Sequence, residues 1–210
     1  MVCTTLYWAD RQKGYIVDYW LPEFESALFY EVHRVLTRYA RGVDRTDWDL
    51  MVSAFHDDAV DDHGSHLGTA REFADFMKPN QKHITNMMHL NGNLTLLEVD
   101  REAREVLAET YCVGWQRLAA DAPVIPPLFR SDELGDGLNG ARLMAAGSRY
   151  VDLLTERGGE LRIARRTVVY EWVDVAPNGD QSQLEGRTLS RRSRDDASYT
   201  TIAEYRLSPA

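Results

Sequence analysis

The spacing of apolar residues changes near His83, and this change constrains the fold more than any other feature. Before His83, apolar residues recur at helical intervals, whereas after it apolar and polar residues alternate as they do along β-strands. Alternating segments occur at residues 83–99, 105–118, 147–157 and 160–173, and the "RGG" stretch between the last two predicts a hairpin turn. Helices followed by a run of strands predict an α+β fold, in which a curved mixed or antiparallel sheet wraps around the N-terminal helices.

The first predicted helix starts near Pro22, which suits a first turn because its ring fixes φ and its missing N–H is not needed there. Apolar side chains then follow at intervals of three and four residues and predict one buried stripe: Phe24, Leu28, Val32, Val35 and Tyr39. Gly42 is expected to end this helix.

Two shorter helices are expected after Gly42. Thr46 or Asp47 is suited to cap the second helix, whose buried face would hold Trp48, Met51, Val52 and Phe55. The stretch "AVDDHG" predicts a short strand that runs into a turn, and "GTAREFADFMKPN" predicts a third helix that Pro79 stops.

The chain is long enough for one well-buried domain. It has 210 residues, 44% of them hydrophobic, so we expect one domain over residues 23–176, an N-terminal extension at 1–22 and a C-terminal tail at 177–210 without assigned regular structure. The segment 119–146 is rich in Pro and Gly and separates two strands that would otherwise be close neighbours. Long loops in compact domains are usually functional or disordered, so this insertion is either a lid over a pocket or an excursion without function.

The composition disfavours several classes of partner. The net charge is −9 and the isoelectric point is near 5.1, so we expect no nucleic-acid or anionic-membrane partner. No apolar run approaches the roughly 18 residues of a membrane span, and no leader precedes the first helix, so a cytoplasmic location is expected. Cys3 and Cys112 form neither a disulfide framework nor a zinc motif, which fits a reducing compartment.

Two polar residues near the end of the first helix allow both a structural and a functional interpretation. Asp44 follows Gly42 and precedes the second helix, and because Asp is common in turns and caps, the local pattern alone favours a structural role. Tyr39 lies on the apolar stripe, where a tyrosine is usually a core residue with a hydrogen-bonded hydroxyl.

His89 and Arg149 are the polar strand residues that most suggest a site. Alternation places His89 on a mixed polar face with His83, Thr85, Met87, Asn91 and Asn93. This face is either solvent surface or the lining of a polar cavity. Arg149 shares a strand face with Val151 and Leu153, so it is expected to be buried, with a carboxylate or an anionic substrate group beside it.

Other motifs carry less weight. The "DDHGSH" stretch at residues 61–66 contains carboxylates and imidazoles, but they share one turn and match no ligand geometry, so no metal site is expected. The chain has no G-x-S-x-G elbow, no phosphate-binding glycine loop and no dinucleotide fingerprint. No cofactor is therefore expected.

Four stretches taken together resemble the SnoaL-like family of the nuclear transport factor 2-like superfamily: "YARGVDRTDWD", "FHDDAVDDHG", "TNMMHLNGN" and "GSRYVDLLTERGGELRIARRTVV". The resemblance covers roughly residues 24–173. Within the superfamily the chain is similar to scytalone dehydratase, bile acid 7α-dehydratase and hexachlorocyclohexane dehydrochlorinase. The resemblance implies a cone-shaped half-barrel, with the seam between the first two helices at the mouth of the cone.

The resemblance also implies roles for four residues. In these enzymes an aspartate and a histidine form an acid/base dyad, and the matching positions here are Asp44 and His89. Tyr39 and Arg149 match a tyrosine and an arginine of the bile acid dehydratase. In these roles Tyr39 would protonate a departing hydroxyl or a developing enolate oxygen, and Arg149 would stabilise the negative charge that develops on a carbonyl. Scytalone dehydratase has a second histidine on the next strand, whereas "ETYCVGWQRL" supplies none here.

The implied activity is that of a cofactor-independent lyase. The resemblance favours a dehydratase that removes a proton from a small hydrophobic substrate, polycyclic or aromatic in character. The alternatives are an isomerase or cyclase of the same fold in natural-product or steroid metabolism, and a non-catalytic protein for ligand binding or subunit assembly. A coupled acid/base pair favours an enzyme, because a binding module does not need one.

The resemblance further implies a homodimer or homotrimer, since members of the superfamily commonly pair the outer faces of their sheets. Val168, Tyr170 and Trp172 share one face of the last alternating segment. Large exposed apolar patches usually mark contacts, so this face is expected to form the interface.

Overall fold

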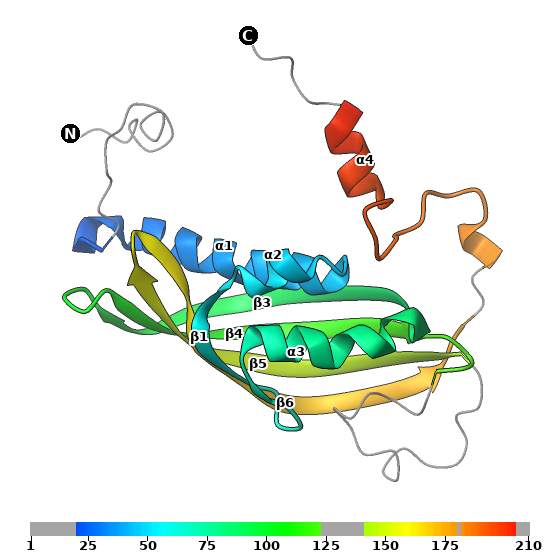
Figure 1. Ribbon diagram of the computed structural model, residues 1–210, viewed down its shortest axis with the longest axis horizontal. Coiled ribbons are helices and arrows are strands. Elements are labelled where there is room, and N and C mark those ends of the chain that lie inside the picture. The colour runs from blue at the N-terminus through cyan, green and yellow to red at the C-terminus, as the bar shows by residue number, and fades with distance from the viewer. Residues whose placement is uncertain (1–19, 123–140, 180–181, 205–210) are drawn as a thin grey trace.

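The computed structural model describes residues 20–122, 141–179 and 182–204, and Figure 1 shows its helices on one face of a curved sheet. A 3₁₀ turn precedes the first helix, and the helices in chain order are α1 (Glu25–Asp44), α2 (Trp48–Val52), α3 (Ala70–Met77) and α4 (Ala197–Glu204). Within these ranges, none of the helices combines the length and the apolar character that crossing a membrane requires.

Six strands form one sheet. They are β1 (Phe55–Asp62), β2 (Leu67–Gly68), β3 (Ile84–Asp100), β4 (Glu105–Leu118), β5 (Arg142–Arg157) and β6 (Glu160–Pro177). Their order is β2-β1-β6-β5-β4-β3, and all neighbours are antiparallel except β1 and β6. The α+β class and the curved mixed sheet are therefore confirmed. Gly158 and Gly159 have positive φ angles and close the predicted hairpin between β5 and β6.

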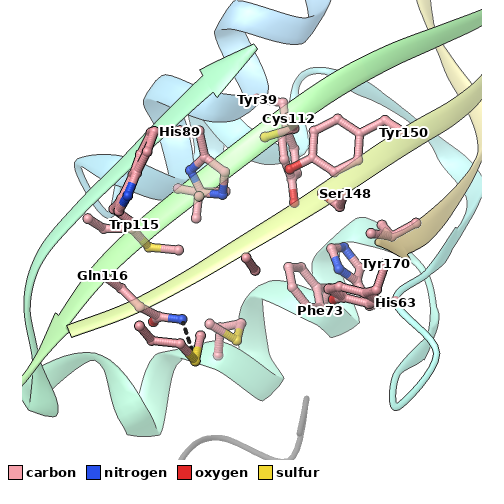
Figure 2. Close-up of a pocket in the computed structure, with 17 residues that line it drawn as sticks. Tyr39, His63, Phe73, His89, Cys112, Trp115, Gln116, Ser148, Tyr150 and Tyr170 are labelled. Atoms are coloured by element: carbon pink, nitrogen blue, oxygen red, sulfur yellow. Dashed lines mark hydrogen bonds between the residues drawn. The ribbon is translucent and has the colours of Figure 1, made fainter. Parts of the chain in front are cut away.

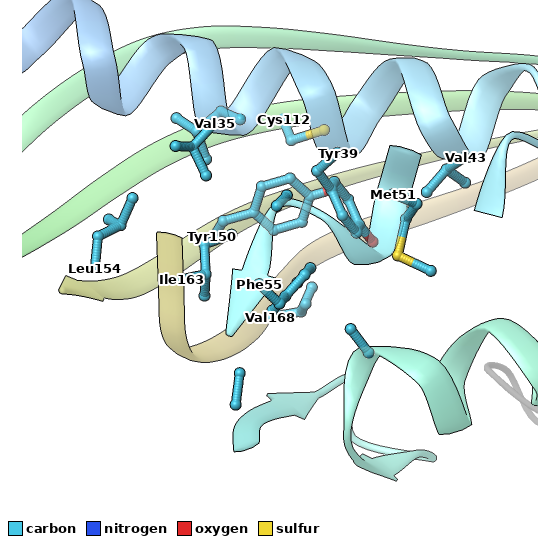
Figure 3. Packing of buried hydrophobic residues seen from close by; sticks show 14 of the residues in the cluster. Val35, Tyr39, Val43, Met51, Phe55, Cys112, Tyr150, Leu154, Ile163 and Val168 are labelled. Carbon is cyan, nitrogen blue, oxygen red and sulfur yellow. The ribbon is translucent and has the colours of Figure 1, made fainter. Parts of the chain in front are cut away.

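Helix α1 packs its predicted stripe against the sheet. Leu28, Val32, Val35 and Tyr39 are fully buried, and Figure 3 shows this side of the helix above Tyr150 and Phe55. Full burial of an apolar side chain of this size is worth roughly 1.5–3 kcal/mol relative to exposure. The stripe is therefore the main force that holds α1 on the sheet.

The prediction that Gly42 ends α1 is wrong, because the helix continues to Asp44. A side chain at Gly42 would place its Cβ only 2.4 Å from the backbone nitrogen of Met51. Gly42 therefore allows the close approach of α1 and α2, which local sequence does not reveal. Helix α2 begins as predicted, with the Asp47 side chain accepting a hydrogen bond from the Leu50 N–H. The prediction that Phe55 belongs to this helix is wrong, because the helix ends at Val52 and Phe55 starts β1.

Bulges interrupt the alternation along β3. The pairing of β3 with β4 shifts at three places. Simple alternation puts Leu94 and Leu96 on the face opposite His89, but both pack against the core on the same side as His89. Each bulge adds one residue and so reverses the faces beyond it. Met88 and Leu90 lie between bulges and remain exposed on the outer face.

Arg166 on β6 is a fully buried arginine that the sequence analysis did not single out. Its Nε and Nη2 donate to the two oxygens of Asp152 on β5, at 2.8 and 2.7 Å. The guanidinium carbon lies 4.3 Å from the ring centre of Tyr39 and 4.0 Å from that of Tyr150. The carboxylate and the aromatic faces together offset the hydration that the buried charge has lost.

The C-terminal tail contains structure that the sequence analysis did not assign. Besides α4, it places Arg192 against the C-terminal end of α1, where the guanidinium donates to the carbonyl oxygens of Val43, Asp44 and Ile84. The Thr46 hydroxyl in turn donates to the carbonyl oxygen of Arg192 at 2.8 Å. These contacts anchor the tail at the junction of α1 and α2 (Figure 1).

Two predicted segments fall mainly outside the described residues. Of the N-terminal extension only residues 20–22 are described, and there the Trp20 indole N–H donates to Glu156 at 2.8 Å. Strand β5 starts at Arg142, earlier than the predicted start at Gly147. The choice between a lid and an excursion for the insertion 119–146 stays open, because residues 123–140 lie outside the described part of the chain.

The exposed apolar residues of the sheet differ from those predicted. Val168 and Tyr170 face the core rather than the surface, because this apolar face of β6 is the one that packs beneath the helices. Only Trp172 of the predicted set is exposed. The large exposed apolar side chains of β3, β4 and β6 include Met88, Leu90, Tyr111 and Trp172.

We expect a homodimer or homotrimer in solution that covers the exposed apolar residues of β3 and β4. Leu90→Lys should shift the population toward the 24.0 kDa monomer, because a charge at an exposed apolar position weakens a contact without disturbing the core. Static light scattering at micromolar concentration measures this shift. A wild-type protein that is already a 24.0 kDa monomer under these conditions contradicts the expectation.

The buried ion pair predicts a characteristic pattern of stability. Asp152→Asn leaves the Arg166 charge without a carboxylate and should lower the free energy of unfolding by about 3–5 kcal/mol. The double variant Asp152→Leu with Arg166→Met removes both charges and should recover most of that loss. Urea denaturation of the three proteins measures it, and equal stability of wild type and Asp152→Asn would refute it.

Candidate active site

A cavity lies between α1, α3 and the inner face of the sheet (Figure 2), and its volume is about 70 Å³. Apolar side chains make up much of its wall, among them Val43, Phe73, Met77, Met87, Met144 and Val168. The polar side chains that line it include Tyr39, His63, His89, Gln116, Ser148 and Tyr170. An apolar cavity with a few convergent polar groups is typical of a small-molecule site.

His89 lines this cavity, and Asp44 contacts it from behind without lining the cavity itself. Asp44 is the last residue of α1, and His89 lies on β3. The Oδ1 of Asp44 and the Nδ1 of His89 are 2.6 Å apart, and Oδ2 accepts a hydrogen bond from the His89 backbone N–H at 3.1 Å. The predicted contact between these side chains is therefore present. Only 12% of the Asp44 side chain and 10% of the His89 side chain are exposed.

The position of β3 explains how one carboxylate can bind both the backbone N–H and the ring of His89. β3 is the last strand of the sheet, so the N–H groups along its outer edge have no partner strand. Asp44 accepts one of these N–H groups as well as the ring. An ionised carboxylate only accepts, so the neutral ring carries its proton on Nδ1 and keeps a lone pair on Nε2. Nε2 lies over Gly114, a residue of the cavity wall.

The helix end is an unfavourable place for a carboxylate, because the last carbonyl groups of a helix carry partial negative charge. Arg192 offsets this cost by donating to the carbonyl oxygens of Val43 and Asp44 at 3.1 and 3.3 Å. Burial lowers the pKa of Arg192 to about 10, with the Asp44 charge acting in the opposite direction. Arg192 therefore remains a cation at neutral pH, directly beside Asp44.

Tyr39 lies on the same wall as His89, with their ring centroids 6.4 Å apart. Burial raises the pKa of Tyr39 well above its ordinary value, and the negative charge of Asp61 adds to the effect. The hydroxyl therefore keeps its proton at neutral pH and acts as a hydrogen-bond donor rather than as a base. Its ring packs against the guanidinium of Arg166, whose central carbon lies 4.3 Å from the ring centroid.

The prediction that Arg149 is buried and acts in the pocket is wrong. Its side chain is 28% exposed and donates to Glu109 on β4 at 2.7 Å and to Glu171 on β6 at 2.6 Å. Ser148 and Tyr150 on either side of it line the cavity, and side chains alternate along a strand, so Arg149 points to the outer face. Glu109 and Glu171 are the carboxylate partners that the charge of Arg149 requires, and they hold its side chain on the outer face of the sheet.

His63 and Asp61 are site residues that the sequence analysis missed. The "DDHGSH" stretch, which matched no metal geometry, places His63 in the cavity wall and Asp61 fully buried beside it. The alternation Ala59, Asp61, His63 was the available clue, since it extends a buried strand face into two charged residues. Within the described ranges, no three His, Cys, Asp or Glu side chains gather as metal ligands would.

The family profile of the SnoaL-like domain matches residues 26–167 of the chain. This chain belongs to the SnoaL-like family. The resemblance stated from the motifs is therefore confirmed. The match covers α1 to α3, five whole strands and the first part of β6, and it includes Tyr39, Asp44, His63 and His89. Arg192 lies beyond it.

Solved structures share this fold at low sequence identity. A candidate scytalone dehydratase from Novosphingobium aromaticivorans matches with a TM-score of 0.58 and 12% identity, over 77% of this chain and 100% of that one. A hexachlorocyclohexane dehydrochlorinase of type 2 matches with a TM-score of 0.58 and 13% identity, over 75% and 97%. The β subunit of a candidate aromatic-ring-hydroxylating dioxygenase from Novosphingobium aromaticivorans matches with a TM-score of 0.50 and 19% identity, over 70% and 92%.

At these identities the structural matches establish the fold and no more. A candidate dehydratase, a dehydrochlorinase and the β subunit of a candidate dioxygenase share the same architecture. No curated protein matches the sequence significantly. The activity of this chain must therefore be argued from its own site.

The tail contact predicts a local effect of Arg192→Gln. Losing hydrogen bonds from a charged group should lower the free energy of unfolding by about 1.5–3 kcal/mol. Hydrogen exchange should become faster around Asp44 and in the tail, but not in the β5–β6 hairpin. Arg191→Gln, at the exposed neighbouring position, is the matched control and should change neither. Unchanged exchange at the end of α1 would show that Arg192 does not anchor the tail.

Proposed function

We propose that this protein is a cofactor-independent acid/base lyase that dehydrates a small hydrophobic substrate. The observation that carries the proposal is the 2.6 Å contact between Asp44 and His89 at the wall of an apolar cavity. An imidazole that is held by a carboxylate and faces a cavity is suited to remove a proton from the carbon beside a carbonyl group. Fold neighbours named as a dehydratase and a dehydrochlorinase support an elimination.

Asp44 acts on His89 in two ways in this mechanism. It sets the tautomer, so that Nε2 presents its lone pair to the substrate. It also stabilises the imidazolium that forms when Nε2 accepts the proton, as the aspartate of a catalytic triad does. A base positioned in this way typically contributes about 10²- to 10⁴-fold to the rate.

Tyr39 supplies a hydrogen-bond donor beside the base. Its hydroxyl stays protonated because burial raises its pKa, so it is suited to donate to the carbonyl oxygen on which negative charge develops. A donor held in a cavity with little water stabilises this charge more strongly than a donor in solution. Of the two roles expected for Tyr39, this is the one at the enolate oxygen, where Arg149 was also expected to act.

The lining supports a flat, hydrophobic substrate. Phe73 and Val168 contribute apolar surface, and Met77, Met87 and Met144 contribute flexible thioethers that adapt to ring shapes. The space of about 70 Å³ compares with about 10–15 Å³ for one water molecule on the same scale, so it admits the reacting part of a small ring system.

A β-hydroxylated tetralone tests the reaction, because it is a bicyclic ketone whose dehydration gives the fluorescent product naphthol. We expect the wild-type protein to form naphthol from it. Unsubstituted tetralone has no leaving group, and in deuterated water it reports proton abstraction alone, through exchange of the protons beside its carbonyl group.

His89→Ala should reduce both dehydration and exchange by about 10²- to 10⁴-fold, because it removes the base. Asp44→Asn should have a similar effect, since the amide keeps the shape but loses the charge that stabilises the imidazolium. Arg149→Gln is the matched control and should retain activity, because Arg149 faces the outer side of the sheet. Rates by fluorescence and mass spectrometry are compared with melting curves, to separate catalysis from folding.

Three results would contradict dehydration by this dyad. Near wild-type turnover by His89→Ala would show that the base lies elsewhere. Exchange without naphthol formation would favour an isomerase or a cyclase. Saturable binding of tetralone without either reaction would favour a ligand-binding protein.

A further inference from the structure

A second carboxylate and imidazole lie across the same cavity. Asp61 is fully buried at the end of β1, and His63 follows it into the cavity wall. The His63 ring stacks on Phe73 of α3, with 4.0 Å between the ring centroids. β1 and β3 are separated by three strands in the sheet, and Figure 2 shows His63 and His89 on opposite sides of the cavity.

Three buried polar atoms of this pair lack hydrogen-bond partners among the described residues: Nε2 of His63 and both carboxylate oxygens of Asp61. Nε2 of His63 and Oδ1 of Asp61 are 3.2 Å apart, but the ring does not aim an N–H at that oxygen. Neither oxygen of Asp61 has a hydrogen-bond partner among the described residues. A buried carboxylate without a hydrogen bond is costly, and native proteins rarely keep such a group without a use. The pair is therefore suited to hold a charge or move a proton rather than to stabilise the core.

The charges buried around His63 indicate whether its ring is protonated. Asp61, Asp152 and Arg166 are all fully buried, and Arg166 is bound to both oxygens of Asp152. Arg166 lies opposite Asp61 in the pairing of β1 with β6 but is bound to Asp152, so one buried cation serves two buried carboxylates unless His63 carries a proton. An uncompensated buried charge costs several kcal/mol. The other ionisable groups around the ring are His66 on its own turn and Tyr170 on β6, while α3 presents the uncharged Phe73.

The charges around Asp44 and His89 differ from those around Asp61 and His63. The carboxylate of Asp44 has a cation beside it already, because Arg192 binds the carbonyl groups at the end of α1. Arg192 thus supplies a positive charge near Asp44 that does not depend on a proton on the His89 ring. Two histidines thus line opposite walls of the cavity, one beside a carboxylate without a hydrogen bond and one bound to a carboxylate, and they are placed to act as a proton donor and a proton acceptor.

We propose that His63 is the general acid of the elimination and that Asp61 is its positioning residue. The inference rests on the proposed function, because it assigns the second proton transfer of the same reaction. Dehydration needs both transfers, since hydroxide is a poor leaving group until it is protonated. A donor that faces the base across the cavity is placed for a substrate held between the two.

The two rings together complete the reaction. Nε2 of His89 takes the proton from the carbon beside the carbonyl group, and the electron pair of that C–H bond becomes the C=C bond. The C–O bond of the β-hydroxyl group breaks with its electrons on oxygen, and the proton from His63 turns the leaving hydroxyl into water. His89 ends protonated and His63 neutral, and proton exchange with solvent restores both.

The protonation state of His63 is measurable without any substrate. ¹⁵N NMR of the full-length protein with labelled histidine resolves six imidazoles, which single variants assign. At pH 7 we expect an imidazolium at His63 in the wild type and a neutral ring in Asp61→Asn, with His89 neutral in both. Asp61→Glu should restore the imidazolium, a result that a merely structural role for Asp61 does not predict. A neutral His63 in the wild type overturns the inference, whatever activity the protein has.

The two tetralones separate the acid from the base. His63→Gln should lose dehydration of the β-hydroxylated tetralone by about 10²- to 10⁴-fold, because it cannot protonate the leaving group. It should keep the exchange of unsubstituted tetralone, whereas His89→Ala loses both reactions. His66→Gln is the matched control and should keep both, because His66 packs near the same Phe73 but does not line the cavity.

The other possible results of these measurements would overturn the general-acid role of His63. Wild-type dehydration by His63→Gln overturns the general acid, and so does an equal loss of dehydration and exchange. A wild-type protein that performs neither reaction overturns the acid role together with the proposed function. In that case an imidazolium at His63 would still support the positive charge inferred for this ring. The proposed dehydration would then be wrong, but the charge state of the Asp61–His63 pair would stand.

Discussion

The buried ion pair between Arg166 and Asp152 organises the interior of this protein. It joins β6 to β5 beneath α1, and the rings of Tyr39 and Tyr150 cover the guanidinium. Such a pair adds little net stability, because desolvation costs about as much as the attraction returns, but losing either charge alone is expensive. Tyr39 therefore cannot leave Arg166 without exposing a charge to apolar surroundings. The same contact that packs the core holds the hydroxyl of Tyr39 at the cavity wall.

The pairing of Arg166 also decides the electrostatics around the cavity. Arg166 lies opposite Asp61 in the pairing of β1 with β6 but gives its hydrogen bonds to Asp152, and Asp61 stays buried without a hydrogen bond among the described residues. Asp44, by contrast, receives a cation from the tail, where Arg192 lies outside the part of the chain that the family profile matches. The carboxylates beside the two cavity-lining histidines thus differ, because Asp44 is hydrogen-bonded to His89 whereas Asp61 has no hydrogen bond among the described residues. A core selected for stability alone would pair both, so this imbalance is the kind of local cost that functional sites retain.

Much of the fold follows from local sequence. The stripe on α1, the Asp47 cap of α2 and the glycine turn between β5 and β6 were predicted correctly, because periodicity and turn chemistry act over a few residues. The prediction that Gly42 ends the first helix was wrong, because a glycine is needed there for the close approach of Met51 on another helix. The faces of β3 beyond its second bulge were also read wrongly, because a bulge is invisible to an alternation rule and reverses every side chain after it.

For the candidate site, the sequence by itself determined the residue types and, through its motifs, the contact of Asp44 with His89. Only the tertiary structure decided which arginine is buried. Arg149 and Arg166 both lie in alternating strands with apolar neighbours, and nothing local shows which face of each strand meets the helices. The packing of α1 on the sheet turned Arg166 inward and left Arg149 outside. Alternation specifies two faces of a strand, whereas burial depends on contacts between segments far apart in the chain.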